Sequence, residues 1–227
     1  MTSPENVKVV LLGELGVGKT CIISQLKQGD FNPDTVTSLN ALFISKTLEF
    51  NDLNKVIKYD IWDTAGQERF RALAKIFYKD AKVICLCYDI TSKKSFQELK
   101  DFWYEQQVKL NVDGEPIFAV VANKNDLYQN QQVKDEEGKE FARAINGIFQ
   151  STSAKSYQDI LNLFNNIGHK LCDPNFDTNI IEDKEKEAYE KKKKEDEEKK
   201  YQMQVPGRGL KLEANKAKPQ KKKGGFC

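Results

Sequence analysis

Residues 13–20 read Gly-Glu-Leu-Gly-Val-Gly-Lys-Thr, which matches the pattern G-x-x-x-x-G-K-[ST]. The apolar run 7–12 before this stretch predicts a buried strand, and the run 21–26 after it predicts the start of a helix. In that setting the loop turns its backbone N–H groups toward an anion, and the helix N-terminus adds partial positive charge. We therefore interpret the stretch as a phosphate-binding loop rather than a plain Gly-rich turn. Lys19 would reach the β- and γ-phosphates, and the Thr20 hydroxyl would bind Mg²⁺.

Two later segments indicate which base is bound. The first, Asn123-Lys124-Asn125-Asp126, follows an apolar run, 117–122, that predicts a buried strand. The Asp126 carboxylate can accept two N–H bonds from one edge of guanine, while the methylene stem of Lys124 can cover the base plane. Adenine lacks that pair of donors, so such a site rejects the wrong base by a factor of about 10⁴.

The second segment is Ser153-Ala154-Lys155, which follows a short apolar strand and can supply backbone N–H groups to the guanine O6. Either segment alone also fits a polar turn after a strand. Together with the phosphate loop they favour a guanine-nucleotide site and disfavour an ATP-using kinase.

A fourth segment, residues 62–68, reads Trp-Asp-Thr-Ala-Gly-Gln-Glu. Asp63 ends an apolar run, so it lies at the carboxyl edge of a strand, where it can hold Mg²⁺ through water. The Gly66 N–H can approach the γ-phosphate, and Gln67 is placed to orient an attacking water. Ordinary turn chemistry fits the Asp-Thr-Ala-Gly stretch by itself.

The remaining pattern predicts an α/β fold. Apolar runs at 42–50 and 55–62 flank a turn-forming stretch and predict a hairpin. Strands and helices then alternate, with strands at 83–88, 117–122 and 148–151 and helices at 95–110, 135–145 and 157–171. This order predicts a mainly parallel six-stranded sheet with helices on both faces and one antiparallel hairpin.

Composition restricts the class of protein. The 227 residues suffice for one domain with a substantial core, and a net charge of +2 does not indicate nucleic-acid binding. No apolar run reaches the ~18 residues of a membrane span, and the N-terminus lacks a signal-peptide run. Cys85 and Cys87 alternate in one strand, which favours core packing in a reduced, cytosolic protein over a metal or redox pair. His169 is the only histidine, which excludes a histidine-based catalytic dyad.

The composition changes near residue 175, which predicts a nucleotide-binding domain, 1–175, and a charged tail, 176–227. Residues 182–200 hold eight Lys and nine Asp or Glu and fit either a solvated single helix or a disordered segment. Residues 208–223 hold seven basic side chains and one acidic side chain, a net charge of +6.

With these motifs the chain resembles the Ras superfamily of small GTPases over residues 6–172 and, within it, the Rab family. The segments that carry the likeness to Rabs are Leu39-Asn40-Ala41-Leu42-Phe43, Gln67-Glu68-Arg69-Phe70-Arg71, Phe77-Tyr78-Lys79-Asp80-Ala81 and Cys87-Tyr88-Asp89-Ile90-Thr91. Gly13-Glu14, Ala41 and the tail stretch 207–212 are most similar to endosomal Rabs. The resemblance implies a P-loop NTPase small G domain that hydrolyses GTP and acts as a GTP/GDP switch in endosomal vesicle trafficking.

The resemblance also assigns individual roles. It implies that Phe31 stacks on guanine, that the Ser38 hydroxyl binds Mg²⁺, and that Gln67 is the catalytic residue. An aromatic trio, Phe43, Trp62 and Phe77, would report the switch state to effectors, although plain packing fits Phe43 equally well. The expected Mg²⁺ ligands are Thr20, Ser38 and Asp63, and the expected nucleotide-binding residues are Gly13, Glu14, Leu15, Gly16, Val17, Gly18, Lys19, Thr20, Cys21, Phe31, Ser38, Gly66, Asn123, Lys124, Asp126, Ser153, Ala154 and Lys155.

Two departures from the family pattern bear on hydrolysis. Ser38 stands where Thr is usual, so the closed switch loses one packed methyl group. Leu15 stands beside the γ-phosphate where small residues are usual, and its branched side chain crowds Gln67, the attacking water or an incoming arginine finger. Ser38 therefore favours a switch that is more often open, whereas Leu15 favours slow hydrolysis and leaves open a hydrolysis-poor module that stays GTP-bound and binds effectors.

The end of the tail resembles a Rab prenylation region. Leu210 and Leu212 form an aliphatic pair of the kind that docks on the Rab escort protein, although two incidental leucines also fit. Cys227 is the expected lipidation site, but Phe226 stands where Rabs usually carry a second cysteine, and the ending is not a C-a-a-X box. The implied partners are an exchange factor, a GTPase-activating protein, GTP-selective effectors, the escort protein, GDP-dissociation inhibitor, prenyltransferase and the cytosolic face of an endomembrane, but no nucleic acid.

Overall fold

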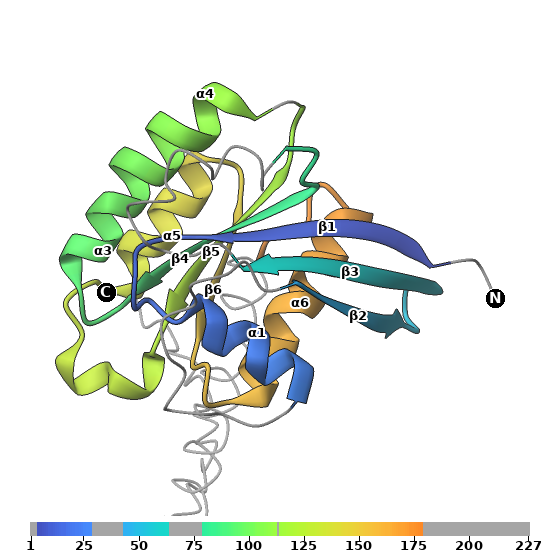
Figure 1. Ribbon diagram of the computed structural model, residues 1–227, viewed down its shortest axis with the longest axis horizontal. Coiled ribbons are helices and arrows are strands. Elements are labelled where there is room, and N and C mark those ends of the chain that lie inside the picture. Colours follow the sequence, from blue (N-terminus) through green and yellow to red (C-terminus); the bar gives the residue numbers. More distant parts are fainter. Residues whose placement is uncertain (1–3, 29–42, 64–78, 113, 179–227) are drawn as a thin grey trace, which may run out of the picture. The chain divides into compact units, whose positions relative to one another are not determined.

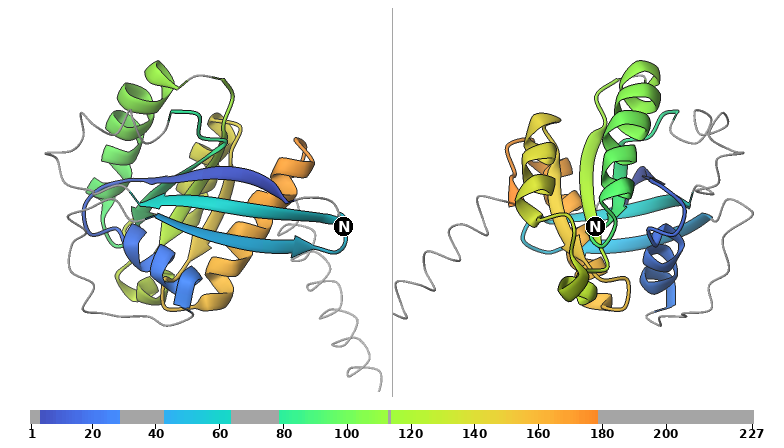
Figure 2. Two further views of the ribbon diagram at one scale, coloured as in Figure 1. Left: turned by 45° about the vertical axis from the view of Figure 1, so that its right-hand side comes forward. Right: turned by 90° about the vertical axis from the view of Figure 1, so that its left-hand side faces the viewer.

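The computed structural model describes residues 4–28, 43–63, 79–112 and 114–178. Its sheet has six strands in the order β2-β3-β1-β4-β5-β6 (Figure 1). The strands are β1 (Glu5–Leu12), β2 (Phe43–Phe50), β3 (Lys55–Asp63), β4 (Val83–Asp89), β5 (Ile117–Asn123) and β6 (Ile148–Thr152). β2 and β3 form an antiparallel hairpin beside β1 (Figure 2), and the other four neighbouring pairs are parallel. This confirms the fold class that the sequence predicts.

Helices cover both faces of the sheet. They are α1 (Lys19–Gln28), α3 (Lys93–Glu98), the π-helix η2 (Leu99–Val108), α4 (Lys109–Asn111), the 3₁₀-helix η3 (Asn125–Asn130), α5 (Asp135–Ala144) and α6 (Tyr157–Cys172). α1 and α6 pack on one face, while α3, η2 and α5 pack on the other, above the sheet in Figure 1. The strands therefore bury side chains on both sides, as parallel strands covered by helices do.

Strand β4 shows how the sheet separates two hydrophobic clusters. Cys85 and Cys87 belong to the cluster under α1 and α6, whereas Ile84 and Leu86 belong to the cluster under α3, η2 and α5. Both cysteines are fully buried, so their expected role in core packing is confirmed. Burial raises the pKa of the Cys87 thiol to about 12, which keeps the thiol protonated at neutral pH.

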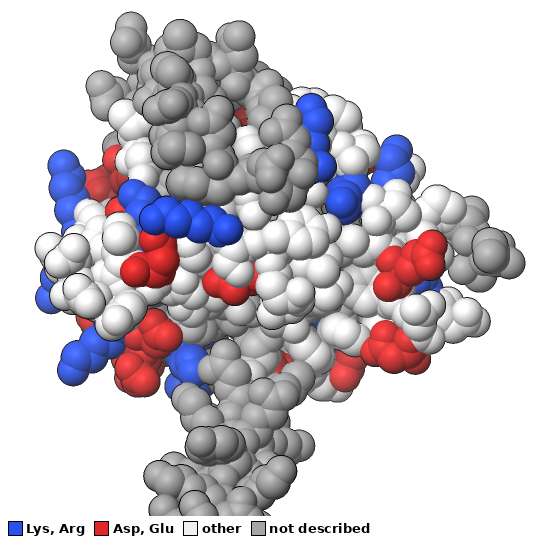
Figure 3. Space-filling view, turned by 90° about the horizontal axis from the view of Figure 1, so that it is seen from below, with Lys and Arg blue, Asp and Glu red and all other residues white. Residues whose placement is uncertain are grey.

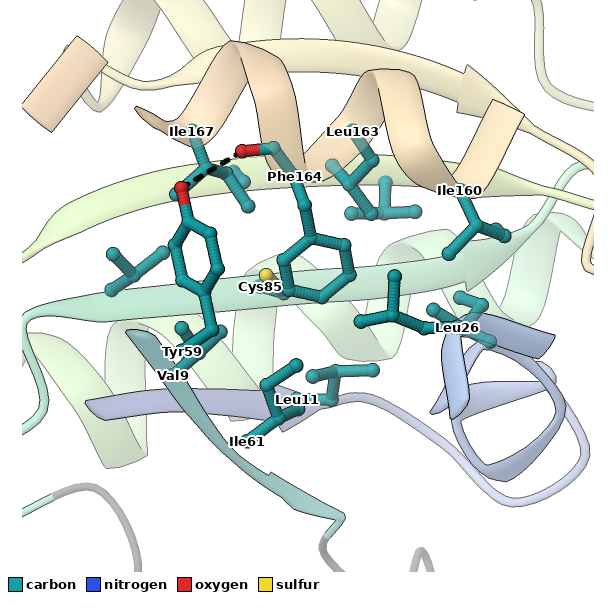
Figure 4. Packing of buried hydrophobic residues seen from close by; sticks show 14 of the residues in the cluster. Val9, Leu11, Leu26, Tyr59, Ile61, Cys85, Ile160, Leu163, Phe164 and Ile167 are labelled. Atoms are coloured by element: carbon teal, nitrogen blue, oxygen red, sulfur yellow. Dashed lines mark hydrogen bonds between the residues drawn. The ribbon is translucent and has the colours of Figure 1, made fainter. Parts of the chain in front are cut away.

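The cluster under α6 also contains a polar contact, drawn in Figure 4. The buried hydroxyl of Tyr59 in β3 donates a hydrogen bond of 3.0 Å to the backbone carbonyl of Phe164 in α6. The two rings meet edge to face with centroids 5.4 Å apart. This contact fixes α6 against the hairpin.

The segment predicted as one helix over 95–110 is instead α3 followed by a π-helix. The backbone N–H of Lys109 donates to the carbonyl of Tyr104, five residues earlier. The buried side chains of this helix are Leu99, Trp103 and Val108. In an α-helix a residue five positions later lies about 140° round the axis, but π-helical winding returns it to nearly the same face. The π-helix therefore lets both Trp103 and Val108 reach the core.

The described chain continues beyond the predicted boundary at residue 175. The ammonium of Lys170 donates to the carbonyls of Pro174 and Phe176, which turns the chain back after α6. Thr178 is buried, and its hydroxyl bonds both the N–H and the carbonyl of Phe149 in β6. Of the two compact units of the chain, the first ends at Glu182, and the second lies outside the described residues.

The surface in Figure 3 mixes charges of both signs. Lys and Arg side chains alternate there with Asp and Glu side chains, and neither sign forms a continuous patch on the coloured part of this face. Within the described ranges, no helix has both the length and the apolar character needed to cross a membrane.

Candidate functional site

The carboxyl ends of the parallel strands converge on one cavity. It has a volume of about 180 Å³ and lies at the sheet edge where open α/β folds bind ligands. Its lining residues are Gly16, Gly18, Cys21, Asn123, Lys124, Asp126, Leu127, Ser153, Ala154 and Lys155. All of these except Leu127 were predicted nucleotide-binding residues, and they come from three segments far apart in the sequence.

Two glycines of the phosphate loop allow close backbone approaches. A Cβ atom on Gly13 would lie 2.2 Å from the Cys87 carbonyl oxygen of β4. A Cβ atom on Gly18 would lie 2.3 Å from the side-chain amide nitrogen of Asn123. Both residues also have positive φ, at 145° and 99°, a backbone conformation that favours glycine. The loop thus packs against β4 and β5 only because these positions carry no side chain.

Lys19 begins α1 and folds back over the loop. Its ammonium donates to the carbonyls of Gly13 (2.8 Å) and Glu14 (2.9 Å), and its side chain is almost fully buried. Burial lowers the pKa of Lys19, while the nearby carboxylates of Asp63 and Glu14 oppose that shift. A buried ammonium at the mouth of a glycine-rich loop is suited to exchanging carbonyl partners for phosphate oxygens.

Thr20 and Asp63 provide the oxygen atoms of a candidate Mg²⁺ site. The Thr20 hydroxyl donates to a carboxylate oxygen of Asp63 at 2.5 Å, and Asp63 is fully buried at the end of β3. Mg²⁺ prefers hard oxygen ligands, usually one or two protein groups together with water and substrate phosphates. A hydroxyl and a carboxylate brought together beside the phosphate loop fit that chemistry.

Asn123, the last residue of β5, ties the loops together. Its side-chain nitrogen donates to the carbonyl of Val17 in the phosphate loop at 2.8 Å. Its side-chain oxygen accepts from the N–H of Ala154 (3.1 Å) and the hydroxyl of Thr152 (3.3 Å). Because Asn123 is fully buried, these bonds fix the phosphate loop relative to the base-side loop.

Lys124 is held by an ion pair with β4. Its ammonium lies 2.6 Å from the Asp89 carboxylate, and its backbone adopts the left-handed conformation, with φ 68°. Asp89 is fixed in turn by the N–H and hydroxyl of Thr91. Asp89 was not among the predicted site residues, although it lies in one of the segments that resemble Rabs.

Asp126 lies in η3 with both carboxylate oxygens engaged. One accepts from the Ser153 hydroxyl at 2.7 Å, and the other lies 2.6 Å from the Lys155 ammonium. Burial alone raises the pKa of Asp126, but the bonds from Lys155 and Ser153 outweigh it and hold the pKa below its usual value. The group is therefore ionised at neutral pH, and its remaining lone pairs can accept base N–H groups.

The backbone donors expected to reach guanine O6 all have protein acceptors in this structure. The Ser153 N–H bonds Asp159, the Ala154 N–H bonds Asn123, and the Lys155 N–H bonds the Ser153 hydroxyl. A base carbonyl would therefore have to take one of these donors from its present acceptor.

Asp159 is a further residue that the sequence interpretation missed. Its carboxylate accepts from the Ser153 N–H (2.9 Å), the Asn125 amide (3.2 Å) and the Ser156 hydroxyl (2.8 Å). It thus links the two base-side loops at the start of α6. The sequence contains a signal for Asp159, because Ser-x-x-Asp before an apolar helix is a capping pattern. The structure shows that Ser156 caps α6 by accepting from the Asp159 N–H.

The remaining predicted residues are only partly described. Phe43 and Trp62 are opposite each other on β2 and β3, with ring centroids 4.8 Å apart, and Phe43 is 47% exposed. Leu15 is 50% exposed on the phosphate loop. The predicted sites that lie outside the described residues are Phe31, Ser38, Gly66, Gln67, Phe77, Leu210, Leu212 and Cys227.

Comparison with known proteins agrees with this geometry. The profile of the Ras family matches residues 8–173. The chain is 38% identical to human Rab-22A over 77% of its own length and 87% of that protein, and 37% identical to Rab5A of Oryza sativa over 73% and 80%. It is 43% identical to RabJ of Dictyostelium discoideum over 72% of its own length and 62% of RabJ. The chain therefore belongs to the Ras family, is similar to Rab proteins within it, and is a small GTPase.

Proposed function

We propose that this GTPase is a Rab-like GTP/GDP switch in vesicle trafficking, attached to the cytosolic face of endosomal membranes. The observation that carries the nucleotide assignment is the shared cavity, where Asn123, Lys124, Asp126 and the Ser153–Lys155 loop meet two phosphate-loop glycines. Guanine would bind between Lys124 and Phe31 and would present its N–H edge to Asp126. The phosphates would lie on the loop N–H groups and Lys19.

The hydrolytic step converts GTP and water into GDP and phosphate. Gln67 would orient the attacking water, and Lys19 and the loop N–H groups would stabilise charge on the phosphate oxygens. Thr20, Ser38 and Asp63 would hold Mg²⁺, which neutralises phosphate charge when bound. In the GTP state both switch regions would close on the γ-phosphate, and they would open after hydrolysis.

The half-exposed Leu15 favours a slow version of this reaction. Its side chain lies on the phosphate loop and would occupy space beside the γ-phosphate that Gln67, the water or an arginine finger must enter. The second candidate function is accordingly a hydrolysis-poor module that remains GTP-bound and recruits effectors.

Leu15→Gly should speed single-turnover hydrolysis with and without an activating protein, measured as phosphate release. Unchanged or slower hydrolysis in this variant would remove Leu15 as the cause.

The two states would differ in their partners. Phe43, Trp62 and Phe77 would contact GTP-selective effectors, and an exchange factor and an activating protein would drive the cycle. Leu210 and Leu212 would dock on the escort protein for prenylation of Cys227, and GDP-dissociation inhibitor would extract the lipidated protein. Chromatography of a cell lysate on GTP-loaded and GDP-loaded protein identifies the state-selective partners. Equal retention of every partner by both forms would contradict a switch.

The nucleotide assignment has its own test. GDP and GTP should displace a fluorescent guanine nucleotide from the chain, whereas ADP and ATP should fail at concentrations about a thousandfold higher. Competition by adenine nucleotides at similar concentrations would overturn the assignment of the Asp126 loop.

A further inference from the structure

A hydrogen bond joins the phosphate loop to the π-helix. The indole N–H of Trp103 in η2 donates to a carboxylate oxygen of Glu14 at 3.1 Å, across 89 positions in the sequence. Trp103 is 1% exposed, so its ring is fixed by the core. Glu14 directly follows Gly13, whose missing side chain allows the loop to pack against β4.

Glu14 is held from two sides. Its backbone carbonyl accepts from the Lys19 ammonium, while its carboxylate accepts from the indole N–H of Trp103. When phosphates bind, Lys19 can exchange a carbonyl of Gly13 or Glu14 for a phosphate oxygen. The Trp103 bond can persist through that exchange, because it uses the side chain and not the carbonyl of Glu14.

The π-helix gives Trp103 its position. Trp103 packs in the cluster with Leu99 and Val108, and its ring meets Phe102 edge to face with centroids 5.3 Å apart. These contacts leave the indole N–H directed at Glu14. π-helical segments occur often at functional sites, and here the segment delivers a rigid donor to the loop.

The carboxylate of Glu14 also carries a charge near the phosphate site. That charge attracts Lys19 and repels phosphate oxygens, so on electrostatic grounds it opposes nucleotide binding. The hydrogen bond and the charge therefore act on nucleotide affinity with opposite signs, and different substitutions can separate them.

We propose that Trp103 is a positioning residue for the phosphate loop. Through Glu14 it holds the loop in the conformation that receives nucleotide phosphates, and it thereby slows nucleotide release without touching the nucleotide. This proposal rests on the guanine-nucleotide binding proposed above.

The test compares GDP release rates among variants of the full chain. Trp103→Phe keeps an aromatic ring and removes the donor, so release should become about fivefold faster. Glu14→Ala removes both the acceptor and the charge, whereas Glu14→Gln removes the charge and keeps an acceptor for the indole N–H, so GDP release should be faster in Glu14→Ala than in Glu14→Gln. The double variant Trp103→Phe/Glu14→Ala should release GDP no faster than Glu14→Ala alone.

The control variant is Tyr104→Phe. It removes a hydroxyl from the same helix and should leave the release rate at its wild-type value.

A spectroscopic measurement separates this role from a general loss of stability. The chain has two tryptophans, so a ¹⁵N-labelled sample gives two indole N–H signals, and Trp103→Phe identifies the one from Trp103. Glu14→Ala should shift the Trp103 signal strongly, and Glu14→Gln should shift it much less.

Additive effects in the double variant, or a Trp103 signal that Glu14→Ala leaves unmoved, would overturn the proposal. Normal GDP binding with an unchanged release rate in Trp103→Phe would overturn this proposal alone. A wild-type chain that binds no guanine nucleotide would overturn the proposed function itself, while the indole signal would still test the contact.

Discussion

The Lys124 ammonium lies 2.6 Å from the Asp89 carboxylate, so the last residue of β4 orients the lysine expected to cover the guanine base. Asp89→Asn removes the charge and keeps the shape, so Lys124 loses its fixed position and GDP affinity should fall about fivefold. Competition with a fluorescent guanine nucleotide measures this change.

Glu5→Gln is the matched control for that variant. Glu5 forms an ion pair of 2.9 Å with Lys82, and both side chains are more than half exposed. The Glu5→Gln variant should keep the wild-type affinity for GDP, because an exposed ion pair contributes little to stability and this pair lies outside the cavity. Equal losses in the two variants would show that Asp89 acts only through general stability.

Asp126→Asn should change the base preference. The substitution replaces one acceptor with a donor that faces the guanine N1–H, so GDP affinity should fall at least about tenfold. Xanthine nucleotides should bind better, because they present an acceptor where guanine presents its amino group. Direct titration with GDP and with xanthosine diphosphate measures both changes. Wild-type affinity for GDP in this variant would disprove the assignment of Asp126.

Asp159→Ala should loosen the base-side loops. It removes the acceptor for the Ser153 N–H and the Asn125 amide, so GDP release should become about fivefold faster. Ser156→Ala is the control, because it removes the cap of α6 but keeps the Asp159 carboxylate that accepts from the Ser153 N–H. The free energy of unfolding should fall by about 1 kcal/mol in both variants. Stopped-flow release and thermal unfolding measure the two effects. The same acceleration of release in both variants would mean that helix capping alone accounts for it.

Membrane attachment should depend on lipid and basic charge together. A single lipid chain on Cys227 would anchor only marginally, and basic residues near an anionic leaflet would add about 1 kcal/mol each. Changing Lys221, Lys222 and Lys223 to Gln should move lipidated protein into the soluble fraction, and raised salt should do the same to the wild type.

Cys227→Ser should abolish attachment and leave GTP binding intact. Sedimentation with membranes measures attachment in each variant, and mass spectrometry of the C-terminus detects the lipid. An unmodified C-terminus on membrane-bound protein would refute attachment through Cys227.

The sequence predicted those parts of the site that lie in continuous motifs. The phosphate loop and the segments around Asn123 and Ser153 each combine residue types that one chemistry requires, so their convergence on one cavity follows from the alternation of strands and helices. The hairpin, the parallel strands and the start of α6 were also predictable, because apolar periodicity and turn residues agree there.

Supporting residues were harder to predict because they act across the fold. Trp103 reads locally as an ordinary buried aromatic residue, and only the tertiary structure brings its N–H to Glu14. Asp89 likewise meets Lys124 only because β4 and β5 end side by side. The π-helix was missed because the pattern over 95–110 predicts a helix but not the type of helix.

The hydroxyl of Thr178 has a consequence for the behaviour of the protein in solution. β2 and β6 are the two outer strands of the sheet, and outer strands can template the addition of a strand from another chain. At Phe149 the outward N–H and carbonyl of β6 are already taken by Thr178, so this residue offers an incoming strand nothing to pair with. A strand added beside β6 would therefore have to displace the Thr178 hydroxyl before it could pair with Phe149.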